Sequence, residues 1–555
     1  MSILWLPVLG RWGRVAALVP LLAGCNVGPN FAPPTAWWSP GSWFPGRSKP
    51  SATKALFSQP VAAPIDPNWW NLFHDRELTA LENRVAASNL DVRVATIRLA
   101  ESRAQLGVAR ADQFPRLNAD GSYTRERVSP LGAIAALGGG TAGGGANGAS
   151  GFASGGNATF AGQGGAFNGA TGTLGAIPAT AVTGGHAIPP FNLWQYGFDS
   201  SWEIDFWGRV RREVESARAS VRAAAENRRN TLISVLAEVA RDYVQLRGIQ
   251  RNLQIVRENL ASAEESLRLT RERAAGGLTT DLDVANAQAQ VNSTAAQIPA
   301  VEQQEAQTIN ALSLLLGQPP RGLRAELAGA EPIPPVPPLV PIGIPAELAR
   351  RRPDVRAAEA QLHAATADVG VAVASFFPAV SLSGSFGLQA LTFSNLGNWD
   401  ARQYGIGPTI SLPIFEGGRL TATLDLRKQQ QKEAATNYQR TVLQALHDVD
   451  NALIAYATEQ RRRGQLQQAV DASRRALDLA RQRYAQGIAT FLDVLDAQRT
   501  VLAAEQQLND STTTVSTDLV ALYKALGGGW EETYPELPAK AGDPEGSGRK
   551  PRARL

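Results

Sequence analysis

The chain has 555 residues, a formal net charge of +4 and an isoelectric point near 9.2. This charge balance is too mild to indicate a nucleic-acid partner. A single cysteine excludes internal disulfides and a thiolate metal cage, and the four histidines lack metal-ligand spacing, so no cofactor or metal is expected. No Gly-x-Ser-x-Gly elbow occurs, and the sequence does not indicate an enzyme.

Residues 1–24 are expected to form a removable export signal. A start containing two arginines precedes an apolar core from Val15 to Leu22, which is too short to span a membrane. The core ends in Leu-Ala-Gly followed by Cys25, which resembles a bacterial lipobox and implies cleavage before Cys25 and acylation of that cysteine. An ordinary signal peptide with an incidental cysteine is the alternative. Asn26 favours the outer membrane, because lipoproteins of the inner membrane commonly carry Asp there. Residues 25–65, rich in Pro and Trp, are expected to form an arm that leads from the lipid anchor.

Four segments carry a helical pattern, with apolar residues at three- and four-residue spacing close to a heptad. They cover about residues 75–113, 209–316, 346–376 and 417–526. Gly276-Gly277 and Gly487 interrupt two of these segments, and each interruption indicates a turn between two helices. The helices alone are equally compatible with an elongated coiled-coil rod.

Four shorter segments alternate between apolar and polar residues. They indicate strands near residues 115–126, 193–206, 378–390 and 402–414. In the second segment Trp194 and Phe198 lie on one face, and Gln195 and Asp199 lie on the other. Each segment is about as long as a tilted transmembrane strand. Half-buried strands on a soluble core are the alternative.

The chain contains an internal duplication. Arg271–Val284 returns as Arg481–Val494, 210 positions later. Each copy is expected to contain a helix, two strands, a long helix, a turn and a further helix. The first repeat covers residues 66–330 and the second covers residues 346–530, and a proline-rich linker at 331–345 joins them.

Two further segments differ from this plan. Residues 128–190 lie between the strands of the first copy, are rich in Gly, Ala and Thr, and contain no Lys, Arg, Asp or Glu. This composition cannot build a core, and we expect a flexible external loop. Residues 531–555 are polar and are expected to form a disordered tail.

The number of strands has a consequence for assembly. After the signal, no stretch reaches about 18 consecutive apolar residues, so a mature chain that crosses a bilayer does so by strands. Four strands cannot close a barrel, and unpaired edges in hydrocarbon leave backbone groups unsatisfied at several kcal/mol each. The strands are therefore expected to be pooled across subunits into a closed ring.

This plan resembles a known family. The two copies, the lipobox, the Phe-Pro before each first strand, Trp-Gly-Arg at 207–209 and Gly-Gly-Arg at 417–419 resemble the TolC-type outer-membrane efflux factors, with the lipidated NodT-like branch nearest. The resemblance covers about residues 25–530. It implies a mixed α and β membrane protein, a homotrimer in which three chains form a 12-stranded β-barrel continued by a long periplasmic α-helical barrel. It also implies contact with outer-membrane lipid, and as partners a periplasmic adaptor protein and an inner-membrane pump, often of the resistance-nodulation-division class.

The same resemblance implies a gate at the inner end of the tunnel. Leu492, Asp493 and Asp496 are expected to constrict the pore, and a threefold ring of carboxylates would attract cations. The alternative is that Asp493 and Asp496 only cap and charge the helix start. Tyr484 matches a residue that ties the closed state to neighbouring helices. The basic residue that some members carry at the position of Ala489 is absent here.

Both turns also match the tips that contact the adaptor in this family. These residues are Gly277, Leu278, Thr279, Gly487, Ile488 and Ala489. Simple helix C-caps are the alternative, and the two roles are compatible. Asp281 and Asp283, at the first turn, are expected to cap rather than to gate. The resemblance therefore implies an outer-membrane efflux channel that exports small molecules. The alternatives are the duct of a type I protein-secretion system and a non-conducting lipid-anchored coiled-coil scaffold.

Overall fold

A computed structural model describes residues 26–34, 58–61, 63–127, 190–343 and 351–535. The chain divides into two compact units. Unit 1 comprises residues 1–31, 104–218 and 364–431, and unit 2 comprises residues 32–103, 219–363 and 432–555. The expected signal, Cys25 and nearly all of the glycine-rich segment lie outside the described residues.

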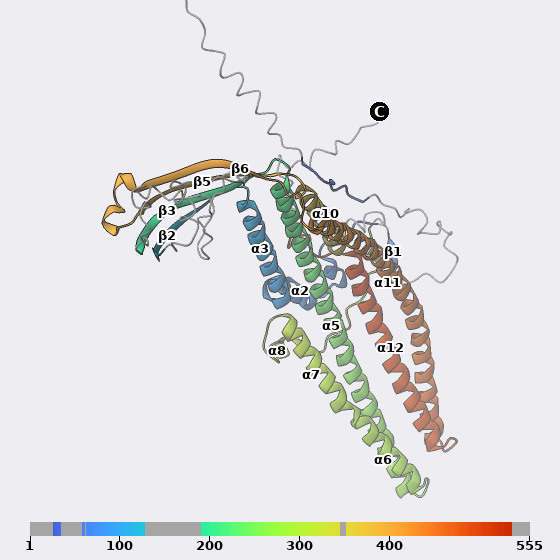
Figure 1. Cartoon of the computed structure of the whole chain (residues 1–555). Helices are drawn as coiled ribbons and strands as arrows, with labels where there is room; N and C mark the ends of the chain where they lie inside the picture. Colours follow the sequence, from blue (N-terminus) through green and yellow to red (C-terminus); the bar gives the residue numbers. More distant parts are fainter. Residues whose placement is uncertain (1–25, 35–57, 62, 128–189, 344–350, 536–555) are drawn as a thin grey trace, which may run out of the picture. The chain divides into compact units, whose positions relative to one another are not determined.

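The elements are labelled in Figure 1. The main helices are α2 (Arg76–Ser88), α3 (Leu90–Ala111), α5 (Arg209–Ala275), α6 (Asp281–Ala295), α7 (Gln297–Leu315), α8 (Arg324–Leu327), α10 (Pro353–Ala374), α11 (Arg419–Ala485) and α12 (Phe491–Leu526). The strands are β1 (Gln59–Val61), β2 (Arg116–Glu126), β3 (Phe191–Ile204), β4 (Leu339–Pro341), β5 (Ala379–Ala390) and β6 (Arg402–Ser411). The four longer strands confirm those expected from the sequence. The order α3-β2-β3-α5-α6 recurs as α10-β5-β6-α11-α12, which confirms the duplication.

Two expected helices are divided by particular residues. Asn89 separates α2 from α3, and its side-chain oxygen accepts a hydrogen bond from the N–H of Val92 at 2.9 Å, which caps α3. Pro299 lies in the first turn of α7, where its missing N–H leaves the carbonyl of Ala295 without a helical donor. The segment that was expected to contain two helices on either side of Gly276-Gly277 therefore contains three.

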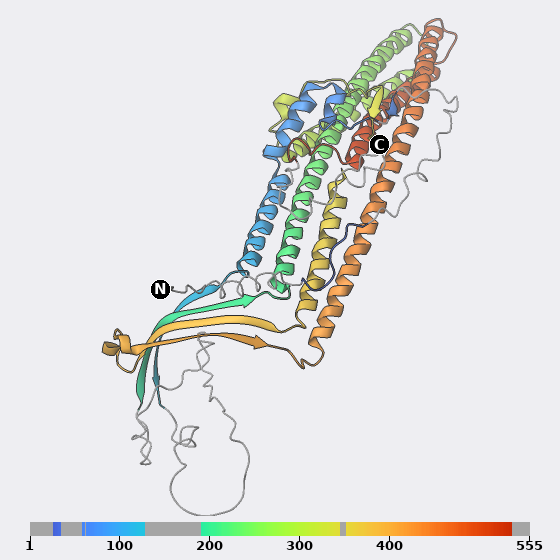
Figure 2. The same ribbon diagram turned by 90° about the horizontal axis from the view of Figure 1, so that it is seen from above.

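Unit 1 contains one antiparallel sheet in the order β2-β3-β5-β6 (Figure 2). Its cross-strand register confirms the two faces expected from the alternation. One rung is apolar and runs Ala119, Phe198, Phe386, Tyr404, and the next is polar and runs Asn118, Asp199, Ser385, Gly405. The apolar face is exposed within the chain, as Tyr404 and Ile406 on the edge strand β6 show.

Unit 2 contains the main hydrophobic core, which α2, α5, α7, α11 and α12 share. Trp69, from the short helix Trp69–Phe73, stacks on Tyr523 of α12 with ring centroids 5.4 Å apart. Both side chains are fully buried. This contact joins the start of the first repeat to the last helix of the second.

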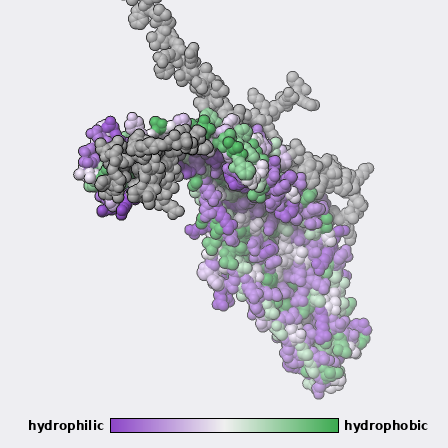
Figure 3. Space-filling view, viewed as in Figure 1, coloured by the Kyte–Doolittle hydropathy of each residue, from purple (hydrophilic) through white to green (hydrophobic). Residues whose placement is uncertain are grey.

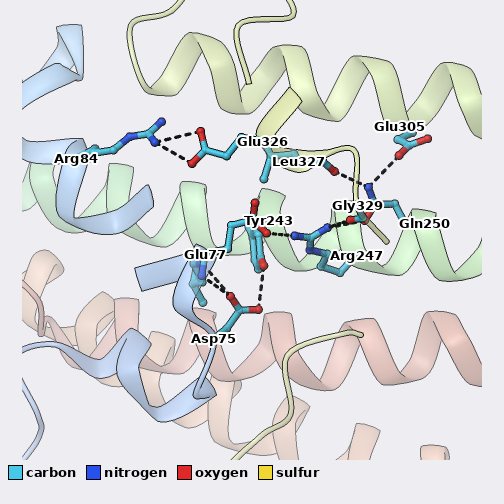
Figure 4. Close-up of polar contacts among 11 residues, drawn as sticks. Asp75, Glu77, Arg84, Tyr243, Arg247, Gln250, Glu305, Glu326, Leu327 and Gly329 are labelled. Carbon is cyan, nitrogen blue, oxygen red and sulfur yellow. Dashed lines mark hydrogen bonds and ion pairs between the residues drawn. The ribbon is translucent and has the colours of Figure 1, made fainter. Parts of the chain in front are cut away.

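A polar network crosses this core (Figure 4). Arg247 of α5 is fully buried, forms an ion pair with Glu77 of α2, and donates a hydrogen bond to the carbonyl of Gly329 at 2.6 Å. The Tyr243 hydroxyl donates to Asp75 at 2.9 Å, and Asp75 in turn caps α2. Both terminal nitrogens of Arg247 are paired, which compensates for burying the cation, so this network fixes α2 on α5.

Two expected boundaries are corrected. The proline-rich segment at 331–345 is more than a linker, because it contains β4, which pairs in parallel with β1 of the N-terminal arm. The expected disordered tail begins too early at residue 531, because Tyr534 is packed. The guanidinium of Arg228 lies 3.7 Å from the centroid of the Tyr534 ring, and Arg229 donates to the Tyr534 carbonyl at 3.2 Å. Cation–π contacts of this kind hold the segment that follows α12.

Candidate gate at the helix turns

The two turns of unit 2 have the same backbone geometry. Gly277 and Gly487 have φ values of 69° and 75°, in the left-handed region that glycine adopts without strain. The N–H of Leu278 donates to the carbonyl of Arg273 at 2.9 Å, and the N–H of Ile488 makes the equivalent bond to Arg483 at 2.9 Å. This pattern is the Schellman motif, so the C-cap interpretation of both glycines is confirmed.

The apolar residues of the two turns face solvent within the chain. Leu278 and Ile488 are 69% and 63% exposed, whereas Thr279 and Ala489 are half-buried. Figure 3 shows that hydrophilic residues cover most of the helical surface on the face drawn, with apolar residues among them toward the end where α6 lies. Each turn thus presents one large apolar side chain to its surroundings.

Acidic residues cap the helices that follow the turns. Asp283 and Thr280 form a reciprocal capping box at the start of α6, as expected for Asp283, while Asp281 lies exposed in the same first turn. Asp493 and Thr490 form the equivalent box at the start of α12. The hydroxyl and backbone N–H of Thr490 donate to the Asp493 carboxylate at 2.8 Å, and these bonds lower its pKa. Capping is therefore the role that the single chain shows for Asp493.

Leu492 and Asp496 differ from Asp493 in having no such local role. Phe491, Val494 and Leu495 point into a small core that α5, α6, α11 and α12 share, while Leu492 and Asp496 are exposed. Leu492 is 57% exposed. Leu492 and Asp496 are four residues apart and share one side of α12. The structure thus presents one apolar and one acidic side chain together, free to face a pore.

Tyr484 is held by a residue from the other repeat. The guanidinium of Arg273, at the end of α5, lies 4.7 Å from the centroid of the Tyr484 ring. It also donates to the carbonyls of Tyr484 and Ala485 at 3.0 and 3.1 Å. The Tyr484 ring packs edge-on against Phe491, with centroids 5.8 Å apart. Its hydroxyl is buried and has no hydrogen-bond partner among the described residues.

Arg273 was not among the residues expected at the gate. A basic residue was expected only at the position of Ala489, after the second turn, whereas the cation comes from the end of the first repeat's long helix. A signal was present, because Arg273 and Arg483 occupy the same position of the repeat. An arginine that occurs in both copies near a helix C-terminus could have been predicted to donate hydrogen bonds to the last carbonyls of a helix.

Polar contacts between helices continue behind the turns. Gln498 of α12 donates to the hydroxyl of Ser266 on α5 at 2.7 Å, and Arg499 donates to Gln290 of α6 at 2.9 Å. Such contacts between polar side chains are individually weak. They can exchange for water when helices separate, unlike the apolar contacts of the main core.

The described residues contain neither a candidate metal site nor a candidate membrane-spanning helix. Within the ranges given above, no group of three or more His, Cys, Asp or Glu side chains could hold a metal ion. Across that same part of the chain, no helix combines the length and apolarity needed to cross a membrane.

Comparison with known proteins identifies the family. A model of the outer membrane efflux protein family matches residues 180–318 and 344–528. The toluene efflux pump outer membrane protein TtgC of Pseudomonas putida is 32% identical over 521 residues, which cover 92% of this chain and 94% of TtgC. The outer membrane protein OprJ of Pseudomonas aeruginosa is 32% identical over 523 residues, which cover 94% of this chain and 96% of OprJ. The solved outer-membrane channel OprN superposes with a TM-score of 0.75 at 32% identity, over 91% of this chain and 100% of OprN.

The chain belongs to the outer membrane efflux protein family. Its fold is that of the TolC-type outer-membrane channels, and its location is the outer membrane. The family, fold and location expected from the sequence are thereby confirmed.

Proposed function

We propose that three copies of this chain form an efflux channel across the outer membrane. The observation that carries this proposal is the sheet of unit 1, which has two open edges, β2 and β6, and an exposed apolar face. Pairing β6 of one chain with β2 of the next satisfies both edges, and three chains supply twelve strands. The apolar face then contacts lipid and the polar face lines the pore.

The proposed channel works with partners. A periplasmic adaptor protein contacts the exposed turns through Leu278 and Ile488, and an inner-membrane pump of the resistance-nodulation-division class supplies small molecules. TtgC and other relatives are outer membrane proteins of efflux pumps, which supports this assignment over a protein-secretion duct. The channel fold supports it over a non-conducting scaffold. Cys25, once acylated, anchors the chain to the outer membrane.

The proposed gate lies at the second turn. Leu492 and Asp496 narrow the pore as two threefold rings, one apolar and one acidic, while Tyr484 and Arg273 keep the end of α11 against the end of α5. Asp493 contributes charge near the constriction but serves first as the cap of α12. Opening requires the end of α11 and the start of α12 to move away from α5.

The test of this function is a conductance measurement on the assembled protein. Full-length protein purified in detergent should run as a heat-resistant trimer with both strand and helix signals in circular dichroism. After insertion into planar bilayers it should show discrete, cation-preferring channels of low conductance. A wholly helical monomer, or a trimer that never conducts, would overturn the proposal.

A further inference from the structure

The first described residues of the chain are bound at the junction of β3 and α5. The N–H of Val27 donates to the carbonyl of Trp207 at 3.2 Å. The side chain of Asn26 occupies the space beside Gly208, where a Cβ atom would lie 2.0 Å from the Asn26 oxygen Oδ1. Gly208 also has a φ of 85°, so a side chain there would be both strained and obstructed. The junction is therefore shaped to admit this segment.

A buried arginine completes the junction. Arg212 of α5 is 2% exposed, and it donates to Asn30 Oδ1 at 2.6 Å, to Glu215 at 2.8 Å and to the carbonyl of Val27 at 3.4 Å. An arginine carries five donors and needs acceptors when it is buried. Residues of the amino-terminal segment supply two of these acceptors. Removing the segment would leave a buried cation short of partners.

Two glycines allow the close approach. A Cβ atom at Gly370 of α10 would lie 2.9 Å from Cδ of Arg212, so this glycine makes room for the arginine stem. A Cβ atom at Gly28 would lie 2.7 Å from the Gly370 Cα, so the two backbones cross without side chains. Gly28 has a φ of 93°, which only glycine adopts readily.

We propose that Trp207, Gly208, Arg212 and Gly370 form a binding site for the segment Asn26–Asn30, and that this site fixes where the lipid anchor enters the membrane. This proposal rests on the acylation of Cys25 in the proposed function. Cys25 directly precedes Asn26, so its Cα lies about 3.8 Å from that of a docked residue. The acyl chains therefore start beside the end of β3, and the anchor is a fixed attachment with no free tether.

The surroundings of the site suit an acyl chain. Large apolar side chains are exposed where the strands meet the helices, and they include Phe114, Phe206, Ile414 and Phe415. Side chains of this kind at strand ends are typical of the membrane interface. The acyl chains on Cys25 thus insert into the hydrocarbon of the inner leaflet of the outer membrane, next to the end of the proposed barrel that joins the helices. A fixed anchor also loses less conformational entropy on insertion into the membrane than a free tether would lose.

A photoreactive fatty acid tests the placement in cells. Cells that express the full chain are fed a diazirine analogue of palmitate, irradiated, and the cross-linked peptides are mapped by mass spectrometry. In the wild type, cross-links should concentrate at the junction, around Phe206. Gly28→Ala should disperse them, whereas Gly107→Ala should not, because a Cβ atom at Gly107 meets nothing within 4 Å. Asn30→Ala should weaken the concentration, and Asn30→Asp, which keeps an acceptor for Arg212, should restore it.

The outcomes separate the two proposals. If no label enters the wild-type protein, acylation of Cys25 is wrong, and with it part of the proposed function. If label enters but the cross-links spread over the apolar face of the sheet, the anchor is not fixed and this inference is overturned.

Hydrogen exchange gives a readout that needs no lipid. In purified full-length protein the Val27 amide should be protected in both the wild type and Cys25→Ser, and protection should be lost in Asn30→Ala and Gly28→Ala. A freely exchanging Val27 amide in the wild type would also overturn the inference. This outcome depends on the wild-type protein alone, so it holds even if a variant fails to fold.

Discussion

Arg273 and Tyr484, 211 positions apart, join the ends of the two longest helices. The guanidinium lies over the ring at 4.7 Å from its centroid and donates to the Tyr484 carbonyl at 3.0 Å. One side chain thus combines a cation–π contact with a charged hydrogen bond to a helix C-terminus. Both residues belong to the same chain, so the contact needs no neighbouring subunit. It makes Arg273 the first residue to test in the proposed gate.

Arg273→Met should loosen the closed state. The methionine keeps much of the stem but removes the cation, and the contacts that it loses are worth about 1–2 kcal/mol per chain at a half-exposed site. A change of this size corresponds to a roughly five- to thirtyfold larger open fraction for each chain. Single-channel recording in planar bilayers measures it. Arg271→Met is the matched control, since Arg271 is exposed and donates to Gln288 of α6. Equal conductance in the two variants would contradict the role of Arg273.

Leu492→Ala combined with Asp496→Ala should widen the constriction. Each substitution acts three times in the proposed trimer, and removes an apolar ring and three charges. Single-channel conductance should rise, and cation preference should fall with Asp496→Ala alone. Cells that carry the double variant should also become sensitive to vancomycin without a pump. Wild-type conductance in a correctly assembled double variant would place the gate elsewhere.

Tyr484→Phe should leave the gate closed, whereas Tyr484→Ala should open it. The hydroxyl has no partner within the described chain, so its removal costs no hydrogen bond there, while loss of the ring removes the contacts with Arg273 and Phe491. Conductance separates the two variants. A leak in Tyr484→Phe would indicate that the hydroxyl reaches a neighbouring subunit in the trimer.

Asp518 should lower the stability of unit 2 as the pH rises from 3.8 to about 6. Burial and the nearby carboxylate of Glu459 raise the pKa of Asp518 to about 6 from an ordinary value of 3.8. Between these two values the folded chain binds more protons than the unfolded chain, so stability falls with rising pH in this window. Thermal melts from pH 4 to pH 8 should show this slope reduced in Asp518→Asn. Asp478→Asn, at an exposed position on α11, should keep it.

Glu82→Met should raise the melting temperature at pH 8. The Glu82 side chain of α2 is 2% exposed, and neither carboxylate oxygen has a hydrogen-bond partner within the described chain. Its burial raises its pKa well above the ordinary value, and an unpaired acid in a core costs stability in either protonation state. Glu264→Met, at an exposed position on α5, is the control and should change little. A lower melting temperature for Glu82→Met would show that the carboxyl has a structural partner in the trimer.

The regular parts of this fold could be predicted because their signals are local. Strand faces follow from alternation, as at Phe198 and Asp199, and the turns follow from the repeated glycines. Capping by Asp493 could also be stated in advance, since the residue lies three positions after Thr490. These features depend on neighbours within a few positions.

Features that join distant segments could not be predicted in this way. The Arg273–Tyr484 contact, the pairing of β1 with β4, and the burial of Arg212 against Asn30 each link residues that no local pattern relates. The division of the second helical segment at Pro299 was also missed, although a proline rule was available. Proline is tolerated in the first turn of a helix, and Pro299 lies in the first turn of α7, so the boundary between α6 and α7 was not recognised.

The two turns share a backbone but differ in several side chains, and one of these differences bears on the symmetry of the proposed trimer. The residue that corresponds to Tyr484 in the first repeat is Ala274, so Arg483 has no ring to cover and the Arg273 contact has no reciprocal partner. A trimer would therefore present six tips that alternate between two chemically distinct kinds. The six tips of such a trimer would be arranged with approximate sixfold symmetry, but their side chains would repeat with threefold symmetry only. Neighbouring adaptor copies around the channel would therefore bind at non-equivalent sites.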